Sequence, residues 1–299
     1  MSEGIHVCED VAAASKCLLQ HSFAVFRVDG FTESKLNRSW KAGRDFLSHA
    51  SQHNDKVEQF IEKYRYIKNG TLLGFNRPSS QKLLFRAQFV DCNSLEEQPW
   101  PNDFDSGELC QATKDLVPAL HSILLQVHSK IREDIMSTYC DGEDECEQSE
   151  QSEHLRKKRR MSHSFDAYCP LDYFLYTNLQ AGTNCSEHVD RGILICISLS
   201  SLVAGLEVMS RRDGKFYTPE KLAMFESLYK EYDSGASDLI CILAGDQLLD
   251  SLNINDNMGI LAIYPGIQAC NHRVKQELAM ARLSISYELR ESANIKSHL

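Results

Sequence analysis

The chain has 299 residues, of which 42% are hydrophobic and 25% charged, a composition typical of soluble globular proteins. Its formal net charge of −10 disfavours a general nucleic-acid-binding protein, because phosphate contacts need a basic surface. No apolar run approaches the roughly 18 residues that a membrane-spanning helix needs, so we expect no membrane insertion.

The 11 cysteines are scattered, and no two of them form a Cys-x-x-Cys pair. This spacing disfavours a zinc-structured interaction protein. The first ten residues, Met1 to Asp10, are mixed and acidic and do not resemble a secretory signal. We therefore predict reduced cysteines rather than a disulfide framework, and the cytoplasm as the default location.

The N-terminal part predicts a helix, a short strand and a second helix between Val11 and Leu47. The strand contains Phe23 to Phe26, and Thr32 or Ser34 is the expected cap of the second helix. Apolar residues at spacings of three and four predict a long amphipathic helix from Leu116 to Tyr139. We assign residues 1–140 to this helix-strand-helix region and its supporting helices.

Residues 141–163 form a segment with an acidic run followed by a basic run, Arg156 to Arg160. Almost none of these side chains can be buried, so we predict a solvated, disordered loop. The basic run either neutralises the acidic run beside it, which we favour, or serves as a nuclear import patch.

After Ser164 the sequence becomes rich in strand-forming residues separated by Gly, Asn and Asp. The candidate strands are Tyr173 to Asn178, Ile193 to Leu199, Leu206 to Met209, Asp238 to Leu243, Gly259 to Tyr264 and Ala281 to Leu289. Lys221 to Tyr232 resembles a helical insertion. We predict a mainly β fold with helical additions: a double-stranded β-helix (jelly roll) core over residues 164–290, beside the helix-rich N-terminal region.

The last nine residues, 291–299, are expected to form an exposed tail. The tail ends in Ser297-His298-Leu299, which resembles the peroxisomal Ser-Lys-Leu address.

Metal-capable side chains occur in His188-Val189-Asp190, at positions i and i+2, which point to one face on a strand. His272, which ends a strand-like stretch, is the best third ligand. Two histidines and one carboxylate form the facial ligand set of non-haem iron(II) oxygenases. The spacing alone is weak, because His53-Asn54-Asp55 repeats it.

Arg282 and Ser284 follow His272 on an alternating strand and face the same way. A guanidinium and a hydroxyl suit a carboxylate such as C5 of 2-oxoglutarate. An arginine on a late strand is, taken alone, more often part of a surface salt bridge.

Ordered motifs in this region are similar to those of the isopenicillin N synthase-like branch of the 2-oxoglutarate- and iron(II)-dependent dioxygenases. The similar segments are His188 to Asp190, Gly205-Leu206-Glu207-Val208, Asp213-Gly214-Lys215, Gly245-Asp246-Gln247-Leu248, His272-Arg273-Val274 and Arg282 with Ser284. Tyr176 is loosely similar to the family's tyrosine at the cosubstrate. The separation of 84 residues between His188 and His272 (272 − 188) is longer than usual.

The resemblance implies Fe²⁺ on His188, Asp190 and His272, and 2-oxoglutarate held by Arg282, Ser284 and Tyr176. It also implies a small-molecule substrate, dioxygen and ascorbate as a candidate reductant, with a monomer as a plausible state. The alternatives are an iron(II) oxidase of the same family that does not use 2-oxoglutarate, and a non-catalytic jelly-roll binding module. The substrate itself is not indicated.

Overall fold

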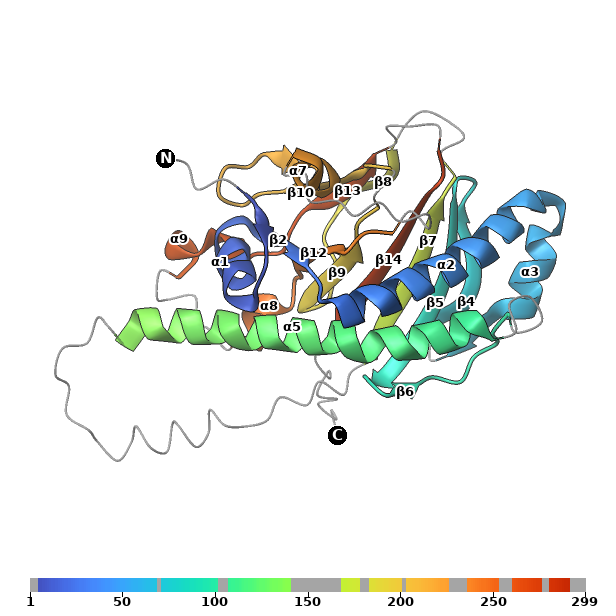
Figure 1. Cartoon of the computed structure of the whole chain (residues 1–299), viewed down its shortest axis with the longest axis horizontal. Coiled ribbons are helices and arrows are strands. Elements are labelled where there is room, and N and C mark those ends of the chain that lie inside the picture. The colour runs from blue at the N-terminus through green and yellow to red at the C-terminus, as the bar shows by residue number, and fades with distance from the viewer. Residues whose placement is uncertain are drawn as a thin grey trace, which may run out of the picture.

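The fold is two facing β-sheets with helices covering the outer face of the larger sheet (Figure 1). The computed structural model of the chain describes residues 5–68, 71–101, 107–140, 168–177, 183–200, 203–225, 236–252, 260–275 and 280–290. The predicted charged loop and the C-terminal tail with its tripeptide lie outside these residues. Within the described ranges, no helix has the length and apolarity needed to cross a bilayer.

The larger sheet has ten strands in the order β1-β2-β12-β9-β14-β7-β5-β4-β3, with β6 paired to β5. Their bounds are β1 Val7–Cys8, β2 Phe23–Arg27, β3 Arg65–Lys68, β4 Thr71–Ser79, β5 Lys82–Asp91, β6 Ser94–Leu95, β7 Cys169–Tyr176, β9 Leu194–Ser198, β12 Leu239–Ala244 and β14 Arg282–Leu289. Strands from the first hundred residues therefore flank the C-terminal strands on both sides.

The smaller sheet has four strands in the order β11-β10-β13-β8. They are β8 Thr183–His188, β10 Leu206–Met209, β11 Phe216–Tyr217 and β13 His272–Lys275. Together with β7, β9, β12 and β14 they form the predicted jelly-roll core.

Alternation along the central strands divides the core in two. On β9 and β12, residues such as Ile195 and Cys241 face the smaller sheet, whereas Cys196 and Ile242 pack on the other face against the helices. Because both faces are covered, these strands are continuous apolar runs rather than alternating ones.

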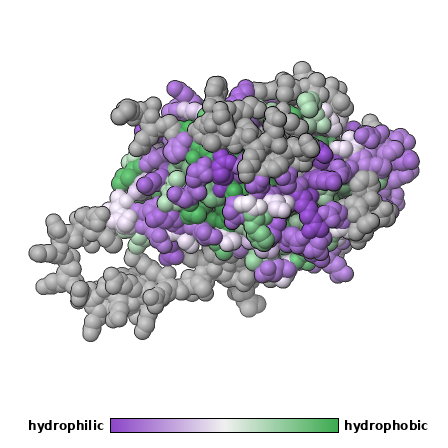
Figure 2. All heavy atoms as spheres, in the orientation of Figure 1, coloured by the Kyte–Doolittle hydropathy of each residue, from purple (hydrophilic) through white to green (hydrophobic). Residues whose placement is uncertain are grey.

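Three helices cover the outer face: α1 Val11–His21, α2 Gly30–Gln52 and α5 Glu108–Cys140 (Figure 1). The shorter helices are η1 Asn54–Lys56, α3 Val57–Tyr64, α7 Pro219–Phe225, α8 Leu248–Ser251, α9 Ile260–Ile263 and η3 Pro265–Ile267. The apolar stripe of α5 is fully buried, as its spacing predicts. On the face seen in Figure 2, hydrophilic residues cover most of the described surface.

Most predicted elements are present, but two details are wrong. The run Gly259 to Tyr264, predicted as a strand, contains helix α9, because a short apolar run does not distinguish a strand from a buried helical turn. The cap of α2 is Asp29 rather than Thr32 or Ser34; its carboxylate accepts a hydrogen bond from the backbone N–H of Thr32 at 2.7 Å. The helix predicted at Lys221 to Tyr232 begins at Pro219 as α7, and residues beyond 225 lie outside the described ranges.

Candidate metal centre

The two histidines of the predicted triad are brought together by strand register. His188 ends β8 and His272 begins β13 rather than ending a strand, and the antiparallel pairing places them directly opposite each other. Their ring centroids are 4.2 Å apart. Each Nδ1 lies near a backbone carbonyl, Ser186 O at 2.8 Å and Cys270 O at 3.2 Å. Since a carbonyl only accepts, each Nδ1 donates, and Nε2 is the atom of each ring that a metal would bind once it carries no proton.

Asp190 completes the triad from the turn after β8 rather than from the strand itself. Its carboxylate oxygens lie 3.6 Å from Nε2 of His188 and 3.4 Å from Nε2 of His272. All three ligand atoms lie within 4.8 Å of one another. His272 is buried, whereas 38% of the His188 side chain is exposed, so the triad is open on the His188 side.

The protonation of the triad follows from its surroundings. Burial alone would raise the pKa of Asp190, but the hydrogen bond from His272 and the charges of both histidines lower it below its usual value. The hydrogen bond with Cys185 is the largest cause that raises the pKa of His188, to about 9. A metal must therefore displace a proton from His188 at neutral pH.

The turn that carries Asp190 is fixed by the segment Gly245 to Leu248. The backbone N–H of Asp246 donates to Asp190 O at 3.0 Å, and that of Gln247 donates to Gly192 O at 3.2 Å. A Cβ on Gly245 would lie 1.8 Å from Gly192 O, so only glycine allows this approach. The Gly-Asp-Gln-Leu motif thus positions the metal-binding turn without contributing a ligand.

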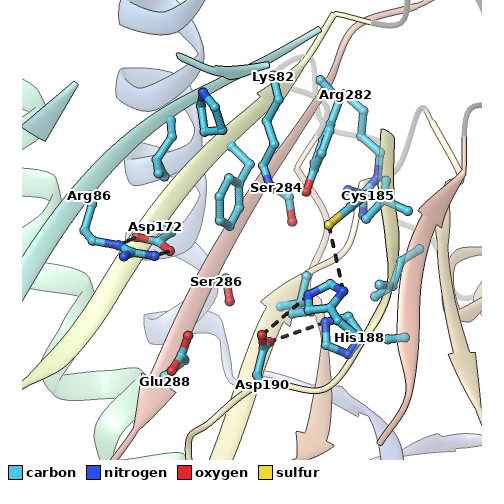
Figure 3. Close-up of a pocket in the computed structure, with 18 residues that line it drawn as sticks. Lys82, Arg86, Asp172, Cys185, His188, Asp190, Arg282, Ser284, Ser286 and Glu288 are labelled. Carbon is cyan, nitrogen blue, oxygen red and sulfur yellow. Dashed lines mark hydrogen bonds and ion pairs between the residues drawn. The ribbon is translucent and has the colours of Figure 1, made fainter. Parts of the chain in front are cut away.

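The triad opens into a cavity of about 260 Å³ between the two sheets. Register aligns its floor in rows across β5, β7 and β14: Lys82, Tyr176 and Arg282 form one row, and Leu84, Phe174 and Ser284 form the next. In Figure 3, Lys82 and Arg282 lie at one end, Asp190 and His188 at the other, and Ser284 between them. All six predicted site residues line this one cavity.

Arg282 is not part of a surface salt bridge. It is 1% exposed, and its Nη2 donates to Oε1 of Glu220 at 2.8 Å, itself 0% exposed. Its Nε and Nη1 are also buried and have no hydrogen-bond partner among the described residues. Buried guanidinium nitrogens without a partner suit an anion such as a carboxylate, which would bind along one edge of the Arg282 guanidinium.

Glu220, on α7, was not predicted from the sequence. Its Oε1 also lies 3.4 Å from the backbone N–H of Leu206, on β10. A Cβ on Gly205 would lie 3.3 Å from Cδ of Arg282 and 2.9 Å from Lys275 O. The Gly205-Leu206 pair therefore leaves room for the arginine and helps to hold the glutamate that orients it. The helix predicted from Lys221 began one residue too late to include Glu220, which lies in the first turn of α7.

The second His-x-Asp, at His53 and Asp55, lies at the end of α2 and in η1. Neither residue belongs to a three-residue potential metal group in the described ranges.

No protein-family model matches the chain, and neither does any curated protein. Solved structures do match over nearly its whole length. A putative 2OG-Fe(II) oxygenase family protein from Caulobacter crescentus has a TM-score of 0.59 at 15% identity, covering 94% of this chain and 82% of that one. Arabidopsis thaliana AtDAO1 (dioxygenase for auxin oxidation 1) in complex with 2-oxoglutarate has a TM-score of 0.56 at 12% identity, covering 96% and 93%. A Neurospora crassa protein in complex with alpha-KG and thymine has a TM-score of 0.59 at 13% identity, covering 94% of this chain and 81% of that one. The chain therefore has the fold of these oxygenases.

Proposed function

We propose that the chain is an iron(II)- and 2-oxoglutarate-dependent dioxygenase that oxidises a small-molecule substrate, by hydroxylation or desaturation, with release of succinate and CO₂. One observation carries the proposal: a His-Asp-His triad and an arginine with two buried, unpartnered nitrogens line the same cavity. Solved structures of the same fold hold 2-oxoglutarate, which supports the choice of cosubstrate.

The residues present fit both groups. Two imidazoles and a carboxylate, with space left on one side, suit Fe²⁺ with open coordination positions. Iron bound there would supply the activation of dioxygen. The backbone bonds to Nδ1 of His188 and His272 hold both rings in place, and the charges around Asp190 keep its carboxylate ionised. The protein thus supplies a preorganised ligand set.

The cosubstrate would lie along the floor of the cavity. Arg282 and Ser284 would bind its far carboxylate, with Tyr176, buried beside Arg282, completing that end. Apolar side chains of the wall, Leu206 and Val274 among them, exclude water from the reacting groups.

The test is release of labelled CO₂ from 1-labelled 2-oxoglutarate by protein loaded anaerobically with Fe²⁺. Asp190→Ala and His272→Ala should abolish both iron binding and CO₂ release, while His53→Ala, in the other His-x-Asp, should change neither. Arg282→Met should raise the Kd of 2-oxoglutarate roughly tenfold or more, since hydrogen bonds to charged groups contribute about 1.5–3 kcal/mol.

The same assay separates the alternatives. Iron binding with oxygen consumption but without CO₂ release would identify an oxidase that does not use 2-oxoglutarate. Failure to bind iron would identify a binding module and refute the proposal.

A further inference from the structure

Two cations of the cavity belong to neither the triad nor the cosubstrate clamp: Arg86, which is paired with Asp172, and Lys82. Lys82, on β5, projects from the row that it shares with Tyr176 and Arg282. Its Nζ lies 4.1 Å from the centroid of the Phe174 ring and 5.3 Å from that of Tyr176. The Lys82 ammonium therefore lies toward the next row, that of Phe174 and Ser284, which is nearer to Asp190 (Figure 3).

The acids of the cavity wall already have basic partners. Asp172 accepts two hydrogen bonds of 2.6 Å from Arg86, and Glu288 accepts two from Arg290, of 2.9 and 2.6 Å. Asp190 lies between the two histidines. Within the described residues, no carboxylate lies within ion-pair distance of Lys82; its Nζ lies over the two rings, and its charge helps to lower the pKa of the Cys185 thiol. The cavity floor therefore has two sets of donors that no carboxylate of the described residues accepts from: the ammonium of Lys82, and Nε and Nη1 of Arg282.

The two sets suit two different anions. A carboxylate of 2-oxoglutarate bound along one edge of the Arg282 guanidinium and by Ser284 would have its strongest acceptor positions filled. The ammonium of Lys82 lies over β7, one strand away from β14, where that carboxylate would lie. Around it are apolar side chains, Leu84, Phe174 and Pro78. An unpaired charge among apolar groups favours an anion that carries an apolar body.

We propose that Lys82 is the anchor for an anionic group, a carboxylate in the simplest case, on the substrate. This inference rests on the proposed function and names its substrate class: a small organic acid with an apolar body. The cavity of about 260 Å³ is at the low end of the roughly 300–1,000 Å³ common for small-molecule sites, and the cosubstrate shares it. The substrate is therefore small, with its carboxylate at the Arg282 end and its oxidised carbon toward the triad.

The experiment compares acids with their amides. Binding of phenylacetate, indole-3-acetate and hexanoate, each against its carboxamide, is measured by anaerobic calorimetry on protein loaded with Fe²⁺ and 2-oxoglutarate. We expect wild-type protein to bind at least one acid about tenfold or more tightly than its amide. Lys82→Met should bring that ratio to about one, and Lys82→Arg should retain it.

A matched control is Lys35→Met, because Lys35 also lies over an aromatic ring, 4.0 Å from the centroid of Phe31, but on the protein surface. This variant should behave as wild type. The proposal is overturned if no acid is preferred over its amide, if the preference survives Lys82→Met, or if Lys82→Met weakens only 2-oxoglutarate.

The Kd of 2-oxoglutarate, measured in the same titrations, tests the proposed function separately. If 2-oxoglutarate does not bind, that function fails. The acid and amide comparison is then repeated without iron and cosubstrate, where it still tests Lys82.

Discussion

The buried pair of Arg282 and Glu220 makes a quantitative prediction about stability. Glu220→Ala would leave a guanidinium that is 1% exposed without its carboxylate partner. Removing one partner of a buried ion pair costs about 3–5 kcal/mol. The typical free energy of unfolding is about 5–15 kcal/mol, so this loss is a large fraction of it. At roughly 2–4 °C per kcal/mol for large domains, Tm should fall by about 10 °C.

The assay is urea unfolding followed by tryptophan fluorescence and circular dichroism, in a double-mutant cycle. Glu220→Gln keeps the hydrogen bond to Nη2 and should lose less stability than Glu220→Ala. The cycle combines Glu220→Leu and Arg282→Met; the double variant replaces both charges by apolar groups and should recover much of the stability that each of these single changes loses. Additive effects of the two single changes, or a loss below about 1 kcal/mol for Glu220→Ala, would refute the view that the pair is buried and coupled.

The triad and the packing of α2 each support a further prediction. The pKa of His188 is about 9, above the usual 6.5, so the imidazole is protonated below that pH. Metal binding must release this proton, and the Kd for Mn²⁺ should therefore fall about tenfold for each pH unit from pH 6 to 8. A Kd that does not change with pH, measured by calorimetry, would contradict this. Gly43→Ala should lower the free energy of unfolding by about 1–3 kcal/mol, because its Cβ would lie 2.4 Å from the ring of buried Tyr173. Gly30→Ala, with nothing within 4 Å, is its control in urea unfolding, and equal effects of the two would refute the packing argument.

The jelly-roll core could be predicted because its central strands are buried on both faces. Apolar runs such as Ile193 to Leu199 and Asp238 to Leu243 match β9 and β12 closely. The edge strand β3 and its neighbour β4 were not predicted, since exposed residues interrupt their apolar pattern. The hydrophobic pattern of a strand depends on how much of its two faces the rest of the protein buries.

The site could be predicted as a set of residues but not as an arrangement. Spacing in the sequence paired His188 with Asp190, but the register of β8 and β13 is what brings His272 opposite His188. Glu220 was missed because its role depends on α7 lying over β10, a tertiary contact with no local signal. Lys82 was missed because no strand was predicted at residues 82–91, which form β5.

The order of strands in the larger sheet has a consequence for synthesis of the chain. β2 pairs with β12, and β5 pairs with β7, so strands that are synthesised early have partners that are synthesised much later. Until then their backbone N–H and C=O groups are open edges, which other chains can pair with. Such long-range pairings also slow folding. The nascent N-terminal half is therefore the stage at which this protein most needs protection from aggregation, well before its metal centre can exist.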